Sequence, residues 1–155
     1  IKVPEEVDAS EGMLVSDVAQ LTGDPSKGAM SAQLCLMCHR IGDKGVYFGP
    51  DLTGLAKRQS VETLITAILR PSEEITHGYD TREVITTDGI VVQGIGLNVG
   101  GDPLLIQSIG GVTQMIPAKR IQSVTRVGHS LMLSARQLGL QAQDVADVIA
   151  YLKTQ

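Results

Sequence analysis

Apolar residues recur at helical spacing in two stretches of the chain. In the segment 61–69 they stand at positions i, i+3, i+4, i+7 and i+8. The segment 145–152 shows the spacing i, i+3, i+4 and i+7 near the C-terminus. A third helix is predicted to begin after Asp24 and to run toward Cys35, because Asp is a favoured N-cap residue and Pro25 suits the first helical position.

Between Tyr79 and Val127 the pattern changes to short runs that are typical of strands. These runs are rich in Val, Ile and Thr and are separated by turn residues. The tripeptide Thr87-Asp88-Gly89 is a strong hairpin signal. About five strands fit into this stretch, whereas no helix of normal length does.

The expected domain boundaries follow from these changes of pattern. The residues before Gly23 are mixed and acidic and have no clear period, so residues 1–22 are interpreted as a tail or linker. Residues 23–155 are expected to form one mainly α domain, with a small antiparallel β-sheet inserted at about residues 79–127. The class expected overall is α+β with the helices dominant.

Both cysteines of the chain lie in one pentapeptide, Cys35-Leu36-Met37-Cys38-His39. This C-x-x-C-H pattern is typical of a c-type haem attachment site. On a helix, Cys35 and Cys38 lie about one turn apart on one face, so each thiol can form a thioether with one haem vinyl group. His39 follows directly, and its imidazole can bind the iron from the proximal side. The pattern predicts one haem c, bound covalently through Cys35 and Cys38.

The pentapeptide has three other interpretations. A structural disulfide between the two cysteines would leave His39 unexplained. A thioredoxin-like dithiol requires the pair at the start of a helix that follows a strand, whereas the segment before Cys35 is expected to be helical. A zinc site needs four ligands, and only His77 and His129 remain to complete one. Haem attachment is the preferred interpretation.

Composition and charge are compatible with a buried porphyrin. Apolar residues make up 43% of the 155 residues, but aromatic residues make up only 3% and tryptophan is absent. A haem would supply the large, flat apolar body that the side chains lack. The net charge of -4 gives no reason to expect binding to nucleic acid or to anionic lipid. No apolar run approaches the length of an integral membrane segment.

The cellular location is inferred from the motif. The first residue is Ile1 rather than Met, so we expect a processed product or a piece excised from a longer chain. Haem is attached to C-x-x-C-H motifs outside the bacterial cytoplasm, which implies a signal peptide that has been removed. The expected location is periplasmic or otherwise extracytoplasmic.

The sixth ligand of the iron is expected beyond the predicted sheet. Met132 is preferred, because it lies after the last strand and before the terminal helix, and because a thioether is a soft, neutral ligand that favours ferrous iron. Met132 could instead fill a gap in the core. Met115 lies within a strand pattern and is a weaker candidate. His129 could replace Met132 and give a bis-histidine site, and His77 or His129 could bind a haem propionate.

Several motifs taken together resemble those of class I cytochromes c, and more specifically the Pirellula/Verrucomicrobium-type haem-binding domain. The resemblance covers roughly residues 24–153. The motifs that carry it are Gly28, Cys35-x-x-Cys38-His39, Gly49-Pro50-Asp51-Leu52-Thr53-Gly54, Ile68-Leu69-x-Pro71-Ser72, Gly78-Tyr79, Thr87-Asp88-Gly89, Ile116-Pro117, Ser130-Leu131-Met132 and Asp147-x-Ile149-Ala150-Tyr151-Leu152.

The resemblance implies a set of site residues and a mainly α cytochrome c fold. His39 would be the proximal iron ligand and Met132 the distal one. The carbonyl group of Pro50 would accept a hydrogen bond from the His39 ring, which orients the imidazole and increases its electron donation. One departure is visible, since Leu133 stands where the family usually has proline after the methionine.

Two classes of function follow from these expectations. In the first, the chain is an electron carrier rather than an enzyme, or the haem domain of a larger oxidoreductase. Its redox partners would be an extracytoplasmic dehydrogenase as donor and an oxidase or another cytochrome as acceptor. In the second, the distal position is open, and the haem serves as a gas sensor or reacts with peroxide. His129 is the only nearby polar residue expected to assist such chemistry, so electron transfer is preferred.

Overall fold

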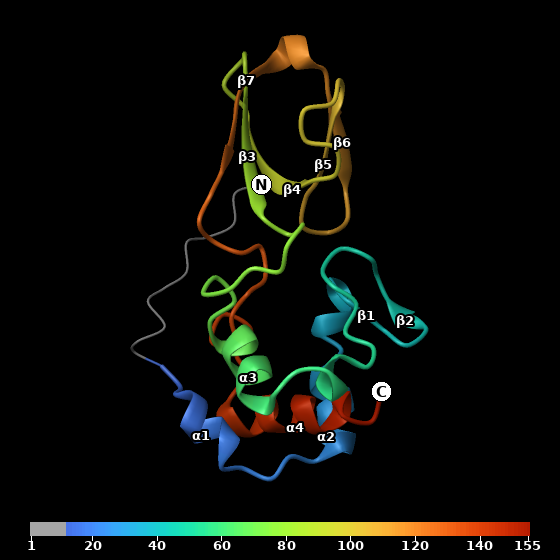
Figure 1. Ribbon diagram of the computed structural model, residues 1–155, viewed down its shortest axis with the longest axis vertical. Helices are drawn as coiled ribbons and strands as arrows, with labels where there is room; N and C mark the ends of the chain where they lie inside the picture. Colours follow the sequence, from blue (N-terminus) through green and yellow to red (C-terminus); the bar gives the residue numbers. More distant parts are fainter. Residues whose placement is uncertain (1–11) are drawn as a thin grey trace. The chain divides into compact units, whose positions relative to one another are not determined.

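The computed structural model describes residues 12–155, which fall into two compact units (Figure 1). Residues 75–131 form one of them, here called the sheet unit. Residues 12–74 and 132–155 together form the other, the helical unit. Each unit has an apolar core of its own. The chain therefore leaves the helical unit after Glu74 and returns to it at Met132.

The helical unit consists of short helices and one very short hairpin. Its elements are α1 (Val15–Ala19), α2 (Pro25–Ser31), η2 (Cys35–Met37), β1 (Arg40–Ile41), β2 (Lys44–Gly45), η3 (Leu55–Lys57), α3 (Val61–Leu69) and α4 (Ala142–Leu152). The Asp24 carboxylate accepts hydrogen bonds from the backbone N–H groups of Ser26 and Lys27 at 2.9 and 3.3 Å. The Ser60 hydroxyl accepts one from the Thr63 N–H group at 3.1 Å. Both helices are thus capped at their N-termini by a side chain that accepts hydrogen bonds from N–H groups without a partner inside the helix.

Helices α2 and α4 pack closely against each other at Gly28. A Cβ atom at this position would overlap the carbonyl group of Asp147 and would lie 2.9 Å from the Cβ atom of Tyr151. The Asp147 side chain is only 3% exposed. Its Oδ1 atom accepts hydrogen bonds from the Asp24 backbone N–H group at 2.7 Å and from Gln143 Nε2 at 2.8 Å. Helix α4 is therefore tied to the first turn of α2.

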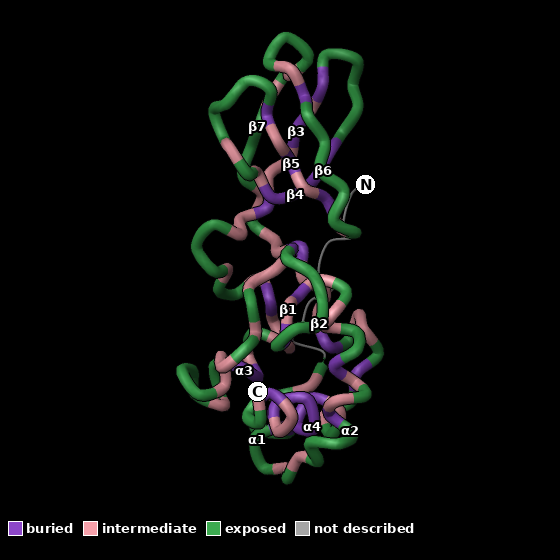
Figure 2. Tube along the Cα trace, turned by 90° about the vertical axis from the view of Figure 1, so that its right-hand side faces the viewer, coloured by how far each residue is buried: buried purple, intermediate pink, exposed green. Residues whose placement is uncertain are grey.

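The core of the helical unit is built around α4, most of which is coloured as buried in Figure 2. One apolar cluster joins α4 to α1 and α3 through Val18, Leu64, Ile65, Val145 and Ile149. A second cluster consists of Ala32, Ile41, Val148 and Leu152, with Cys35, Leu36, Leu52, Ala56 and Tyr151 packed against it. The second cluster brings the cysteine motif onto the C-terminal half of α4.

The close approach of α2 and α4 makes Gly28→Ala a test of the packing. Alanine normally stabilises a helix interior by about 1 kcal/mol relative to glycine. At Gly28 the added methyl group overlaps the backbone of α4, so we expect the free energy of unfolding to fall by about 1–3 kcal/mol. Urea titration measures this change. Gly128→Ala is the control, because a Cβ atom there meets no atom within 4 Å. Equal stability of the two variants would contradict the packing.

The sheet unit contains one five-stranded antiparallel sheet. Its strands are β3 (Thr81–Thr86), β4 (Val91–Gly96), β5 (Leu104–Gln107), β6 (Thr113–Ile116) and β7 (Ile121–Arg126), and η4 (Ala118–Arg120) joins β6 to β7. The strand order is β6-β5-β4-β3-β7. Gly89 has a φ angle of 84°, which lets the predicted hairpin close between β3 and β4. The prediction of about five strands in this stretch is confirmed.

The expected fold class, a mainly α cytochrome c fold, is wrong. About 28% of the chain is helical and 21% lies in strands. One helix is shorter than the sequence pattern suggested, since α2 ends at Ser31 and does not continue to Cys35. The stretch 40–58 contributes little helix, because glycines with positive φ angles turn the chain at Gly42, Gly45 and Gly54.

The expected tail over residues 1–22 divides into two parts. Residues 1–11 lie outside the described residues. Residues 15–19, which were interpreted as part of a tail or linker, form helix α1. The Val18 side chain is 1% exposed and belongs to the core of the helical unit. A single buried side chain in a helix of five residues gives no periodic signal in the sequence.

Candidate functional site

The cysteine motif forms a single tight turn after α2. The carbonyl group of Cys35 accepts hydrogen bonds from the backbone N–H groups of Cys38 at 3.1 Å and of His39 at 2.8 Å. In a 3₁₀ turn, residues three apart stand above one another, so the turn brings the two cysteines to neighbouring positions. Both thiols are half-buried and are not joined by a disulfide bond. The motif thus presents two separate thiols followed directly by a histidine.

The segment 46–49 holds this turn in place from the other side. The N–H group of Val46 donates to the carbonyl oxygen of His39 at 3.2 Å. The N–H groups of Phe48 and Gly49 both donate to the carbonyl oxygen of Cys38, at 3.2 and 2.6 Å. Three backbone hydrogen bonds therefore fix the two carbonyl groups at the end of the motif.

The His39 ring is fixed by Pro50 and Gly49. Its Nδ1 atom lies 2.6 Å from the carbonyl oxygen of Pro50. Because a carbonyl oxygen only accepts, Nδ1 is the nitrogen that carries the proton, and Nε2 keeps its lone pair in the neutral ring. A Cβ atom on Gly49 would lie 2.6 Å from Cε1 and 2.8 Å from Nδ1 of the ring, so only glycine allows this close approach.

Burial keeps the three motif side chains neutral near pH 7. The His39 side chain is 8% exposed, and burial lowers its pKa, against the hydrogen bond with Pro50, which raises it. Burial also raises the pKa of the Cys35 and Cys38 thiols. At Cys35 a backbone hydrogen bond opposes this effect, and the neighbouring thiol adds to it. The site therefore offers a neutral imidazole and two protonated thiols.

The structure bears on the alternative interpretations of the motif. The cysteine pair follows α2 and not a strand, which is unlike a thioredoxin-like dithiol. His77 and His129, the further ligands that a zinc site would use, belong to the sheet unit. Among residues 12–155 no group of three or more His, Cys, Asp or Glu side chains lies close enough to hold a metal ion. The described side chains alone therefore form no zinc site.

Met132 lies in the same compact unit as His39. It is half-buried and stands in irregular structure just before a turn that is anchored to α3. The anchor is the Ala135 N–H group, which donates to the carbonyl oxygen of Ile68 at 2.9 Å. A hydrogen bond from the Leu140 N–H group to the Ala135 carbonyl oxygen, at 2.8 Å, closes the turn. The role of Met132 as an iron ligand stays a prediction.

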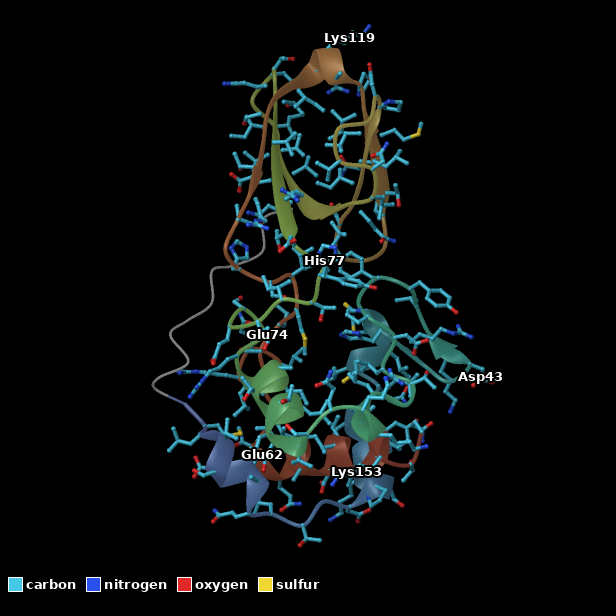
Figure 3. The ribbon with its side chains drawn as sticks, viewed as in Figure 1. Asp43, Glu62, Glu74, His77, Lys119 and Lys153 are labelled. Carbon is cyan, nitrogen blue, oxygen red and sulfur yellow. The ribbon has the colours of Figure 1, made fainter. Side chains whose placement is uncertain are left out.

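The other candidates for the sixth position lie in the sheet unit. Met115 is an exposed residue of strand β6. His77 is exposed as well and is labelled in Figure 3. His129 is half-buried, and its Nε2 atom has no hydrogen-bond partner in the described part of the chain.

Sequence reasoning placed four residues of the site, and the structure brings them together. These are Cys35, Cys38, His39 and Pro50, and the contact between His39 and Pro50 that the resemblance implies is present. Gly49 belongs to one of the motifs that carry the resemblance, but the sequence does not predict its contact with the imidazole. The signal was the pair Gly49-Pro50, in which a residue without a side chain precedes the expected hydrogen-bond acceptor.

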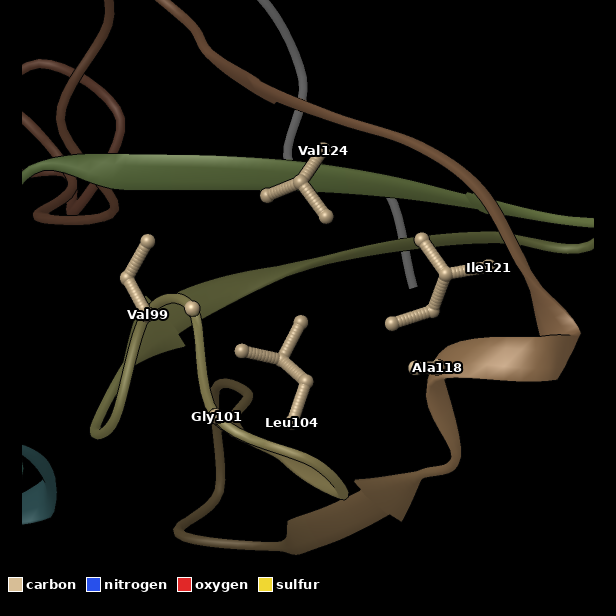
Figure 4. Close-up of a pocket in the computed structure, with 7 residues that line it drawn as sticks. Val99, Gly101, Leu104, Ala118, Ile121 and Val124 are labelled. Atoms are coloured by element: carbon tan, nitrogen blue, oxygen red, sulfur yellow. The ribbon is translucent and has the colours of Figure 1, made fainter.

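A separate apolar pocket of about 400 Å³ lies in the sheet unit (Figure 4). Leu104 of β5, Ile121 and Val124 of β7, and Val99 line it. Its volume falls within the range of small-molecule sites. The residues that line it include no titratable or nucleophilic side chain.

No protein-family model and no curated protein matches the chain. The assignment of the site therefore depends on the residues and the geometry described above. Among the described helices, none has both the length and the apolar character needed to cross a membrane.

Proposed function

We propose that the chain carries one haem c, attached covalently to Cys35 and Cys38, and that its function is one-electron transfer. The observation that carries the proposal concerns His39, which directly follows the C-x-x-C turn. The Nδ1 atom of its ring is hydrogen-bonded to the Pro50 carbonyl oxygen. A histidine ligand to a metal commonly donates its second ring N–H group to such an acceptor. The resemblance to class I cytochromes c supports the same assignment.

The residues around the turn fit an apolar macrocycle. Cys35 and Leu36 pack against the apolar cluster that includes the buried side chains of Ile41 and Val148. The two thiols are half-buried and protonated, and a thiol adds its sulfur and its hydrogen across a vinyl double bond without a leaving group. The donor set is thus two thiols for attachment and one neutral imidazole for the iron.

Each residue has a distinct part in the proposed function. When bound, the haem supplies a ferric–ferrous couple. His39 offers the Nε2 lone pair, and Pro50 and Gly49 hold the ring in one orientation, so that little rearrangement accompanies a change of charge. Met132 is proposed as the sixth ligand, and its thioether favours the ferrous state. No side chain in this set is required to move a proton.

The proposal includes a location and a class of partners. Haem attachment to C-x-x-C-H motifs implies an extracytoplasmic location. In that setting an extracytoplasmic dehydrogenase is proposed as the electron donor, and an oxidase or another cytochrome as the acceptor. The chain itself is proposed to be an electron carrier or the haem domain of a larger oxidoreductase.

Attachment is tested on protein produced together with a haem-attachment system. We expect the wild-type haem to stay with the polypeptide through denaturation and acid–organic extraction, as seen by absorbance and by the mass of the intact chain. Cys35→Ala leaves one thioether and is expected to lower the yield of holoprotein. In the double variant Cys35→Ala, Cys38→Ala all haem becomes extractable.

The control for this test lies in the same turn. Met37 stands between the two cysteines and is exposed, so Met37→Ala is expected to retain covalent haem at the wild-type yield. Wild-type protein that contains no haem, or only extractable haem, would refute the proposed function.

A further inference from the structure

The pocket of the sheet unit lies on the side of the sheet that carries its apolar core. Leu104 is a core residue that also lines the pocket, and Ile121 lines the pocket and packs against the core. Val124 of β7 pairs in register with the core residue Val84 of β3, so the two side chains project to the same side of the sheet. Val124 is nevertheless 38% exposed. The pocket, about 400 Å³ in volume, is therefore a part of the core side that opens to solvent (Figure 4).

One end of this pocket is formed over a glycine of β4. Gly96 stands on the core side of the sheet, because it is paired with the core residue Ile106. A Cβ atom at Gly96 would lie 2.6 Å from Cγ2 of Val99, which lines the pocket, and 3.5 Å from Cγ of Arg82. The side chains of Val99 and Arg82 therefore both lie over Gly96. This places the stem of Arg82 beside the apolar wall of the pocket.

Arg82 has a second arginine directly opposite it. Strands β3 and β7 pair Arg82 with Arg126 in the same register that pairs Val84 with Val124. Side chains two positions apart on a strand project to the same side, so both arginines stand on the side of the sheet that holds the pocket. Like charges directly opposite each other destabilise an antiparallel pair. An anion bound there would offset this repulsion.

The chain supplies only part of that negative charge. Nη1 of Arg126 lies 3.8 Å from Oδ2 of Asp80. Arg82 is half-buried, and its guanidinium has no ion pair or hydrogen bond in the described part of the chain. Glu83 projects to the other side of the sheet, where it accepts a hydrogen bond from Gln93 Nε2 at 2.7 Å. A half-buried cation therefore stands beside an apolar pocket without an acceptor of its own among the described residues.

From this arrangement we infer that the pocket binds a medium-chain monocarboxylate, an ion that combines an aliphatic tail with a carboxylate head. The tail would lie against Val99, Leu104 and Val124, because no residue that lines the pocket carries a charge. The head would accept hydrogen bonds from the Arg82 guanidinium, whose planar set of donors matches a carboxylate. A volume of about 400 Å³ is near the lower limit of small-molecule sites, which favours a single short chain over a two-chain lipid. The site lies wholly within the sheet unit, so the inference is independent of the proposed function.

Three probes separate the two parts of the ligand. Octanoate has both the tail and the head, octanol has the tail with an uncharged head, and acetate has the head almost alone. By isothermal titration calorimetry on the full chain, we expect octanoate to bind about tenfold more tightly than octanol, because a hydrogen bond between charged groups is added to the same tail. Acetate is expected to bind about a hundredfold more weakly than octanoate, since it buries almost no aliphatic carbon. Equal affinities for octanoate and octanol, or for octanoate and acetate, would overturn the inference.

Arg82→Gln tests the contact with the head group. We expect it to weaken the binding of octanoate about tenfold and to leave that of octanol within about twofold of wild type. The matched control is Arg120→Gln, because Arg120 is another arginine of the sheet unit, with Nη2 3.9 Å from Oδ2 of Asp88. This control is expected to bind both probes as wild type does. Equal losses of octanoate affinity in the two variants would assign the effect to the overall charge and overturn the inference.

The unfolding temperature distinguishes ligand binding from a structural role of Arg82. Arg82→Gln removes one of two like charges, so without ligand it is expected to unfold at or above the wild-type temperature. Octanoate is expected to raise the unfolding temperature of the wild type and to raise that of the variant by less. A variant that unfolds at a lower temperature than wild type without ligand would show that the arginine stabilises the unit itself, and would overturn the inference.

The apolar wall of the pocket is tested at Val124. Val124→Asn is expected to weaken the binding of both octanoate and octanol about fivefold, since a polar side chain replaces apolar surface against the tail. Val112→Asn is the control, because it makes the same change at an exposed valine of the sheet unit that does not line the pocket. A Val124→Asn protein that binds both probes as wild type does would overturn the inference.

The optical spectrum keeps this test separate from the proposed function. Octanoate is expected to leave the spectrum of the haem-loaded protein unchanged, because the site does not include the iron. A spectral change with the same concentration dependence as the binding would place the ligand at the haem and overturn the inference. If the chain carries no haem, the proposed function fails, whereas the binding of octanoate to the sheet unit is measured as before.

Discussion

Replacing His39 by alanine is expected to abolish the low-spin spectrum of the holoprotein. The substitution removes the proposed proximal ligand and leaves the Pro50 carbonyl oxygen without its partner at 2.6 Å. Axial ligands set haem potentials over a range of about 0.8 V, and we expect a change of roughly 0.1 V or more for the loss of an imidazole. Optical spectroscopy and a redox titration measure the two effects. Added imidazole should restore the low-spin spectrum, because the substitution leaves space for it.

The matched control for this experiment is His77→Ala. His77 is an exposed histidine of the sheet unit, and its replacement should leave both the spectrum and the potential unchanged. If His39→Ala kept the wild-type spectrum, the proposed proximal ligand would be wrong. If His77→Ala alone changed it, the ligand would lie in the sheet unit.

Replacing Met132 by alanine is expected to open the sixth position of the iron. The ferrous protein should then bind carbon monoxide readily, and the reduction potential should fall by roughly 0.1 V, because a soft thioether stabilises the reduced iron. The ferric wild type should also show the weak sulfur-to-iron band, which the variant should lack. Carbon monoxide binding followed by absorbance gives the clearest measurement.

The control and the contrary outcomes decide between carrier and sensor. Met115→Ala changes an exposed methionine of strand β6 and should leave the spectrum as it is. A Met132→Ala protein with the wild-type spectrum and potential would show that another residue holds the iron. A wild-type ferrous form that is high-spin and binds carbon monoxide at once would favour the gas sensor or peroxide-reactive protein.

Much of the secondary structure was predictable because its signals are local. The periodic segment 61–69 coincides with α3, and the segment 145–152 lies within α4. The hairpin tripeptide after β3 likewise forms its turn. The proportion of helix to strand was not predictable in the same way, because the length of a helix depends on tertiary packing. Helix α1 shows this, since Val18 is the one fully buried side chain among its five residues.

The candidate site likewise has a part that local sequence encodes and a part that depends on the fold. One pentapeptide contains Cys35, Cys38 and His39, so the sequence alone predicts their chemistry. The hydrogen bond from His39 to Pro50 spans eleven positions and was expected only through a resemblance. The contact of Gly49 with the imidazole depends on how the chain folds back, which no local pattern encodes.

The bond between Asp147 and the start of α2 also has a consequence for the order in which the protein is made. The Asp147 carboxylate and the Asp24 N–H group, from which it accepts a hydrogen bond, are separated by 123 positions in the chain. A ribosome therefore delivers the cysteine motif long before it delivers the helix on which that motif packs. In a nascent chain that has emerged only as far as Leu131, the thiols have no α4 to cover them. On the proposed function, an enzyme that attaches haem before α4 is in place would meet both cysteines on an open chain, and α4 would then close the unit around them.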